Sequence, residues 1–454
     1  MQCDTRGLAL STDSPEAALL FSLAVEHYLK AHADTMRLVN DALAADPGFV
    51  MGHVLKGSLL LAGANVASRP AIAACLMAAG SGPATRRERL HIQALEASHN
   101  GQLGVAMDIW DAILDAYPAD LMTIRISNVA HFRHGHTRAI LERSDALARH
   151  WSRDVPGYEC FLTVWAFAHE EVGDTAAADR AIDSVYDIDP VNFFAHHVKA
   201  HILGAEGRQA EGVDWLNAQT VYWPSGANLV HHLWWHQALM MLDLGRRDAV
   251  LDSYDRNIRN FDSPMTKAAP AQFNDLQNAS ALLWRLEQQG LDVGARWEEL
   301  AEKAAAKIDE PAQPLLSPHL MMALASVGRD AAAAGLLQAL RARAAVPEAW
   351  DADGTTEAVI PVCEAVLAHR NGSHGRVVEL LEPILHGALR RLGGSAAQRD
   401  LFRQVLIDSA MRTERRDLVA RMLAEETEGH PSPVGARAGY DVAAKWVGEK
   451  RTAM

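Results

Sequence analysis

The segment that decides the fold runs from residue 193 to residue 251 and reads FFAHHVKAHILGAEGRQAEGVDWLNAQTVYWPSGANLVHHLWWHQALMMLDLGRRDAVL. It contains two His-x-x-x-His pairs, His197 with His201 and His232 with His236. Each member lies 35 residues from its counterpart (232 − 197 and 236 − 201). This interval is typical of a helix–turn–helix repeat, so we expect the two pairs to face each other on neighbouring helices.

Glycines at turn positions recur along the chain at similar intervals. The first steps are 38, 34, 38, 34 and 38 residues, and the later ones are 45, 38 and 44. A period near 34 is typical of tetratricopeptide repeats. The glycines are Gly63, Gly101, Gly135, Gly173, Gly207, Gly245, Gly290, Gly328 and Gly372.

Small side chains occur in phase with these glycines, and they predict that the two helices of each pair approach closely. Four alanines stand seven residues before a turn glycine: Ala94, Ala166, Ala200 and Ala238. Three small residues stand five residues after a turn glycine: Ala106, Ala178 and Gly212. The sequence therefore predicts an all-α fold, an α-solenoid of tetratricopeptide-like helix pairs curling around a central concave pocket.

The repeat divides the chain into two parts. Residues 1–259 form the N-terminal array, and residues 260–454 continue the same solenoid after a proline-containing break at 260–271. Within these parts we expect one helix over 14–45, a loosely ordered link at 76–82 and a helix over 375–392. Strand-like alternation is absent.

Composition and charge narrow the class of protein. The net charge is 43 − 57 = −14, which does not favour nucleic acid as a partner. Four scattered cysteines predict free thiols in a reducing compartment. No apolar stretch approaches the roughly 18–20 residues needed to cross a bilayer, and acidic residues precede the apolar run at 17–25. We expect a soluble, cytoplasmic protein without membrane partners.

One interpretation of the histidine pairs is a metal site. Imidazole suits zinc and other divalent transition metals, and the ligands would be His197, His201, His232 and His236. However, residues 197–201 read HVKAH, so the H-E-x-x-H motif of metalloproteases is missing.

A metal-free, cofactor-free site is the leading functional interpretation of these residues. The same four histidines would be the catalytic residues, acting as acid or base in a hydrolase or lyase reaction on a small molecule. Aromatic walls are typical of small-molecule sites. The candidate substrate-binding residues are Trp223, Trp235, His319, Arg399 and Asp400.

Two further interpretations remain open. The histidines and tryptophans are also consistent with packing between repeats, since the chain has 21 histidines. In addition, the commonest use of such repeats is as a non-catalytic scaffold that binds a peptide or a partner protein in its groove. A closed pocket with buried polar groups would indicate an enzyme, and an open groove would indicate a scaffold.

The strings HHVKAHIL (196–203), HHLWWHQALMMLDLG (231–245), HLMMALASVG (319–328) and LGGSAAQRDLF (392–402) occur in this order. Together they resemble the tetratricopeptide repeat protein 38 family over nearly the whole chain. The resemblance implies a cytoplasmic, closed-up α-solenoid, but no reaction. The chain departs from the family pattern at Gly204, where members commonly have Glu, and at Asn278, where they often have Asp. The positions that match the family's histidines and C-terminal motif are His197, His201, His232, His236 and His319, and residues 393–400.

Overall fold

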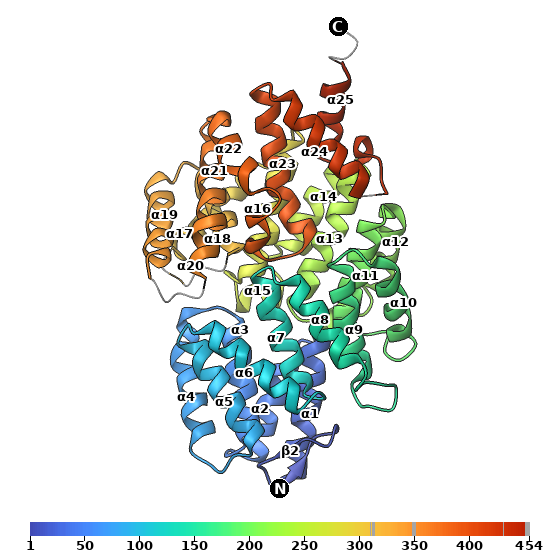
Figure 1. The fold of residues 1–454 in the computed structure, drawn as a ribbon, viewed down its shortest axis with the longest axis vertical. Coiled ribbons are helices and arrows are strands. Elements are labelled where there is room, and N and C mark those ends of the chain that lie inside the picture. Colours follow the sequence, from blue (N-terminus) through green and yellow to red (C-terminus); the bar gives the residue numbers. More distant parts are fainter. Residues whose placement is uncertain (309, 311–313, 347–350, 430, 450–454) are drawn as a thin grey trace. The chain divides into compact units, whose positions relative to one another are not determined.

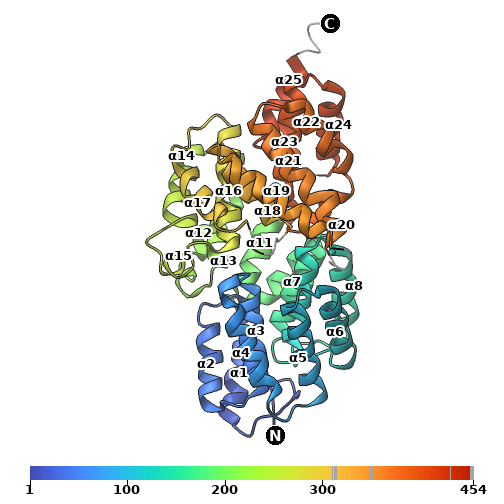
Figure 2. The same cartoon turned by 90° about the vertical axis from the view of Figure 1, so that its left-hand side faces the viewer.

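The computed structural model of the chain describes residues 1–308, 310, 314–346, 351–429 and 431–449. Helix accounts for 73% of the residues and strand for 1%, and the helices pack in adjacent pairs (Figures 1 and 2). They form two compact units, which we call unit 1 and unit 2. Unit 1 comprises Met1–Phe132, Thr137–Lys199 and Thr220–Val230, and unit 2 comprises Arg133–His136, Ala200–Gln219 and His231–Met454. The division of the repeat array at residue 259 remains a prediction.

Unit 1 begins with a short antiparallel ladder between β1 (Gln2–Cys3) and β2 (Ala9–Leu10). Helix pairs follow, and the pairs α1–α2, α3–α4, α5–α6 and α9–α10 each pack closely. The helices are α1 (Pro15–Lys30), α2 (Thr35–Ala45), α3 (Val50–Ala62), α4 (Arg69–Gly80), α5 (Arg86–His99), α6 (Leu103–Ala116), α7 (Leu121–Arg133), α8 (Thr137–Ala148), α9 (Tyr158–Glu170) and α10 (Thr175–Tyr186), with 3₁₀ turns η1 (Val66–Ser68) and η2 (Trp223–Ser225).

Apart from Arg133–His136, unit 2 begins within α11 (Phe193–Ala205), after Lys199. Its α-helices are α12 (Gln209–Gln219), α13 (Leu229–Asp243), α14 (Arg247–Ser253), α15 (Pro264–Ala268), α16 (Phe273–Gln288), α17 (Arg296–Ala305), α18 (Leu316–Ser326), α19 (Asp330–Ala344), α20 (Ala352–Gly354), α21 (Ile360–Arg370), α22 (His374–Leu381), α23 (Ala396–Arg412), α24 (Arg416–Gly429) and α25 (Asp441–Glu449). Two π-helical turns, η3 (Tyr254–Ile258) and η4 (Thr355–Val359), and three 3₁₀ turns, η5 (Glu382–Ile384), η6 (Ala388–Leu392) and η7 (Val434–Ala436), complete it.

The repeating glycines end helices as predicted, with one exception. All of them from Gly101 to Gly372 adopt a positive φ between 67° and 91°, which an L side chain rarely adopts. Gly63 instead has a φ of −68°, and the next residue, Ala64, takes the left-handed conformation at 49°. In the first repeat of the series, the left-handed turn residue is therefore Ala64 instead of the glycine before it.

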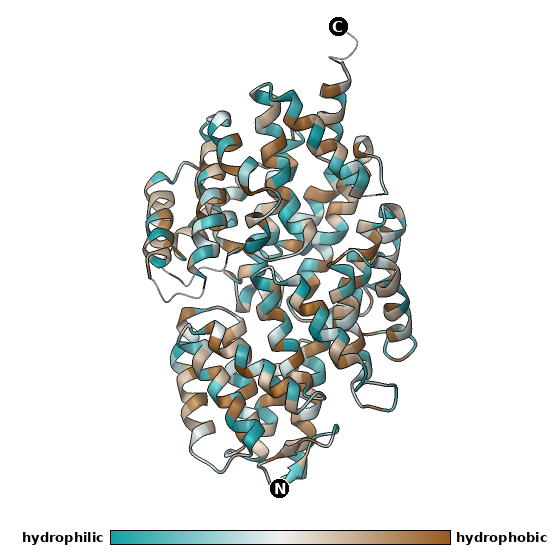
Figure 3. Ribbon diagram, in the orientation of Figure 1, coloured by the Kyte–Doolittle hydropathy of each residue, from teal (hydrophilic) through white to brown (hydrophobic). Residues whose placement is uncertain are grey.

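The small residues in phase with the glycines are buried, which confirms the close approach predicted for them. Gly212 of α12 shows why size matters there: an added Cβ would lie 2.4 Å from Sδ of Met240 on α13. Hydrophobic and hydrophilic residues alternate around the helices (Figure 3). This amphipathic pattern is typical of helices that bury one face.

Two of the predicted helices are wrong. The helix expected over 14–45 is broken at Ala31, which has a φ of 60°. The break is stabilised by the segment around Gly226, since His32 pairs with Gly226 and the amide of Ala227 donates to the carbonyl oxygen of Ala31 at 2.7 Å. The helix expected over 375–392 ends at Leu381, and Pro383 then lies in a 3₁₀ turn.

The predicted link at 76–82 is also wrong, because α4 continues through it to Gly80. Ile72, Cys75 and Ala79 share one buried face of α4, and this face packs against α3. The ladder of β1 with β2 was not predicted either. Each of its strands is only two residues long, so it carries no pattern of alternation.

Within the described part of the chain, each helix is either too short or too polar to cross a lipid bilayer.

Candidate functional site

The two histidine pairs lie on α11 and α13. Residues four apart share one face of an α-helix, so each pair projects from a single face. Their side chains are almost entirely buried, with exposed fractions of 4% to 9%. We call the three that belong to unit 2, His201, His232 and His236, the histidine cluster.

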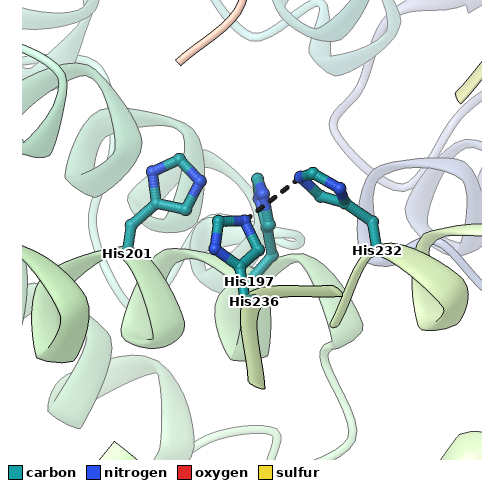
Figure 4. A group of neighbouring side chains, drawn as sticks. All are labelled: His197, His201, His232 and His236. Atoms are coloured by element: carbon teal, nitrogen blue, oxygen red, sulfur yellow. Dashed lines mark hydrogen bonds between the residues drawn. The ribbon is translucent and has the colours of Figure 1, made fainter. Parts of the chain in front are cut away.

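The imidazoles of the cluster converge. Nε2 of His236 lies 3.1 Å from Nε2 of His232, and the ring centroids of His201 and His236 are 4.5 Å apart. One ring nitrogen from each of these three residues lies within 4.8 Å of the others (Figure 4). The spacing of the two pairs predicted this convergence, whereas the catalytic role of the four histidines remains a prediction.

His197 differs from the other three in its surroundings. Its ring lies 5.8 Å from that of Phe194 at an angle of 22°, and 6.1 Å from that of Phe167. Unlike the other three histidines, it belongs to unit 1, and the boundary between the units falls after Lys199, within α11. Unit 2 therefore supplies three converging imidazoles, and His197 lies one helical turn before the first of them.

Helix α16 positions the histidines of α13. The Nδ1 atom of His232 bonds to Oδ1 of Asn278 at 2.8 Å, and Nδ1 of the neighbouring His231 bonds to Oδ1 of Asp275 at 3.2 Å. Since an amide oxygen accepts hydrogen bonds, the proton of His232 is on Nδ1 and the lone pair on Nε2 faces the cluster. Asn278 thus fixes the tautomer of His232.

Trp235 covers the cluster on one side. Its ring is stacked on that of His232 with centroids 5.0 Å apart at 11°, and it meets His236 edge-on at 5.0 Å. Trp235 is fully buried, and its indole nitrogen has no hydrogen-bond partner among the described residues. Trp235 therefore packs against two rings of the cluster, and its substrate-binding role remains a prediction.

Burial keeps His232 neutral. Loss of water lowers the pKa of its imidazole to about 4 from 6.5, although the hydrogen bond with Asn278 acts in the opposite direction. At neutral pH the ring is therefore uncharged, and its Nε2 lone pair is available to a proton or a metal ion.

The other predicted substrate-binding residues lie outside the histidine cluster. Trp223 is buried in η2 of unit 1. His319 is on α18, where its Nδ1 donates to the carbonyl oxygen of Leu315 at 2.7 Å and its ring packs against Phe402. The structure does not test their binding roles.

Arg399 and Asp400 lie in the first turn of α23. The guanidinium of Arg399 donates to the carbonyl oxygens of Gly393 and Gly394 in the preceding loop. Asp400 accepts hydrogen bonds from the amide of Gln404 at 2.7 Å and from the hydroxyl of Tyr440. Arg399 therefore holds the preceding loop against the start of α23, and Asp400 links α23 to Tyr440.

The sequence did not indicate that Asn278 and Arg285 lie beside the histidines of α13. Asn278 is buried within α16 and contacts His232. Among the described residues, Arg285 donates to the carbonyl oxygens of Ala281 and Ala397. Its guanidinium carbon also lies 5.8 Å from the centroid of the Trp235 ring. The available signal for Arg285 was its charge, because it interrupts the apolar stretch at 281–286.

Two cavities lie elsewhere. One of about 220 Å³ in unit 2 is lined by residues such as Lys307, Leu320 and Arg343. A more open one of about 570 Å³ in unit 1 lies beside Met1 and Thr85. Neither is lined by a member of the histidine cluster.

No family model matches this chain.

Proposed function

We propose that this chain is a tetratricopeptide-type repeat protein of the family it resembles, and that its histidine cluster is a binding site for a small molecule. One observation carries the proposal. His232 and His236 meet at 3.1 Å between their Nε2 atoms in the interior of unit 2, next to the ring of His201.

The grouping of the buried imidazoles supports a function rather than packing. Grouped, buried titratable residues with a shifted pKa are typical of functional sites, and His232 has such a shift.

Proton transfer is the chemistry that we propose for the site. A neutral imidazole in a fixed tautomer accepts a proton at Nε2 and returns it later, as hydrolases and lyases require. Asn278 fixes the tautomer of His232 through Nδ1, and Trp235 excludes water from one face of its ring. His236 lies within hydrogen-bond distance of His232 and is the second member of the acid–base pair.

The alternative is a scaffold that binds a peptide or a partner protein. Burial favours the small molecule. The three histidines of unit 2 have exposed fractions of only 4% to 9%, whereas an extended peptide needs side chains that it can reach from solvent.

Equilibrium dialysis of the purified protein against a cell metabolite extract tests the proposal. Mass spectrometry then compares the compounds that are retained by the wild type, by His236→Ala and by His231→Ala. His231 is the matched control, because it is a buried histidine of α13 that bonds to Asp275. We expect at least one compound that wild type and control enrich and that His236→Ala does not. If the wild type enriches nothing, or if all three retain the same compounds, a small-molecule site at the cluster is ruled out.

A further inference from the structure

The donor atoms of the histidine cluster are all ring nitrogens, and this sets it apart from the two other groups of described residues that could hold a metal ion and whose members all belong to one unit. In each of those groups an arginine already neutralises the carboxylate. Arg37 bonds to Asp34 at 2.8 Å, and Arg412 bonds to Asp408 at 2.9 Å. A dication would have to displace the arginine. The two groups are His27, His32 and Asp34, and His369, His374 and Asp408.

We propose that His201, His232 and His236 bind one divalent transition-metal ion of the zinc class. This proposal rests on the function proposed above, that the cluster is a ligand-binding site. It adds that one of the ligands is a divalent metal ion. All three residues belong to unit 2.

The separation of the nitrogens fits a metal centre. Zinc binds imidazole nitrogen at about 2.0–2.1 Å in tetrahedral geometry, which places two ligand nitrogens about 3.3 Å apart. The two Nε2 atoms of His232 and His236 are already 3.1 Å apart. The widest separation within the cluster is at most 4.8 Å, so rotation of the His201 ring brings in the third nitrogen.

The hydrogen bond between the two rings is replaced when the ion binds. In the ligand-free protein Nε2 of His236 donates to Nε2 of His232, since the proton of His232 is on Nδ1. Metal binding requires the proton of His236 to move to its Nδ1, after which both Nε2 lone pairs face the ion. No net charge is transferred in this tautomer change.

Asn278 acts as a positioning residue for the metal ligand. Histidines that bind a metal generally donate their other ring nitrogen to a carboxylate, a carbonyl or water, which fixes the ring and raises its basicity. The contact from Nδ1 of His232 to Oδ1 of Asn278 is of this kind. Trp235, stacked on the same ring, restricts its rotation further.

Metal analysis of the full-length protein tests the proposal. The chain is expressed without a histidine tag, stripped with a chelator, and loaded with Zn²⁺ or Co²⁺. We expect about one ion per chain and, for Co²⁺, the visible absorption of a tetrahedral site. His232→Ala and His236→Ala should lose the ion, while His231→Ala should keep it.

Two further variants separate ligation from folding. His236→Cys replaces one zinc ligand with another, so it should retain the ion and add a sulfur-to-cobalt charge-transfer band. Asn278→Ala leaves all three ligands in place and should weaken the affinity for Zn²⁺ about 10- to 100-fold. Equal affinity in Asn278→Ala and wild type would show that the contact with His232 does not position a ligand.

The outcomes distinguish this proposal from the function on which it rests. If the wild type binds neither ion, while retention of a small molecule still depends on His236, the metal proposal fails and the proposed function stands. If both the ion and the small molecule are absent, both fail. Binding of the ion by His236→Ala and wild type alike would also overturn the metal proposal.

Discussion

Acidification tests how completely His319 is removed from water. The ring is buried within unit 2, its Nδ1 bonds to the carbonyl oxygen of Leu315, and the charge of Arg285 on α16 is close enough to oppose its protonation. Burial lowers the pKa of its imidazole from 6.5 to about 4. His319→Gln removes the titrating group while keeping a polar side chain.

The sign of the effect follows from proton binding. In the unfolded chain the imidazole takes up a proton near pH 6.5, whereas in the folded chain it stays neutral down to about pH 4. The unfolded state therefore binds more protons between these two values. The contribution of His319 to stability is complete above pH 6.5 and is lost as the pH falls towards 4.

The size of the effect follows from the shift. About 2.5 pH units at 1.36 kcal/mol each correspond to about 3 kcal/mol. Urea denaturation at pH 7 and at pH 4.5 compares the wild type with His319→Gln. Because pH 4.5 lies above the folded-state value, we expect most of this effect: the difference in their unfolding free energies should change by about 2 kcal/mol in favour of the variant at the lower pH.

A direct readout supports the comparison. The histidine resonance that is missing from the spectrum of His319→Gln belongs to His319, and we expect it not to titrate between pH 7 and pH 5. Other buried histidines also destabilise the folded state in acid, but they are present in both proteins and cancel. Titration of this resonance near pH 6.5, or pH profiles of stability that run parallel in the two proteins, would refute the reasoning.

Three further predictions concern the fold. Gly135→Ala should destabilise unit 2 far more than Gly245→Ala. Both glycines have a φ near +70°, but only the Cβ at Gly135 would collide with a backbone atom, the oxygen of Arg390 at 1.9 Å. Thermal melts of the two variants measure the difference, and equal melting temperatures would contradict the prediction. Burial raises the pKa of Asp243 to about 6 from 3.8, so its contribution to stability is complete below pH 3.8 and is lost as the pH rises through 6. The loss amounts to about 3 kcal/mol. Denaturant titrations across this pH range should show it in the wild type and not in Asp243→Asn. Ser395→Ala removes one half of the capping box of α23 and should cost about 1 kcal/mol at every pH between 5 and 8, which urea denaturation would detect.

Local signals in the sequence were sufficient for the helix ends that depend on local chemistry. The left-handed turns from Gly101 onward need a residue without a Cβ, so glycine marks them directly. Ser395 and Gln398 have the spacing of a capping box, and the hydroxyl of Ser395 accepts from the backbone amide of Gln398. The mean period of the repeat was therefore visible without any knowledge of the packing.

Helix ends that depend on distant residues were not predicted. Ala31 adopts a left-handed conformation, although nothing in its neighbourhood marks a turn. The chain around Gly226, nearly 200 residues away, accepts and donates the backbone hydrogen bonds that make this conformation stable. A pattern of propensities over a short window cannot contain such a contact.

By itself, the sequence determined that helix pairs repeat. It also determined that two histidine pairs, offset by one repeat, each lie on one face of a helix. Both features could be predicted because helical periodicity and turn chemistry are local properties. Only the tertiary structure decided which side chains surround the imidazoles. Asn278 reaches His232 across 46 positions of sequence because α16 packs beside α13, and this contact sets the tautomer. Burial, which sets the charge of His232 and of His319, likewise depends on the whole of unit 2 rather than on any neighbouring residue.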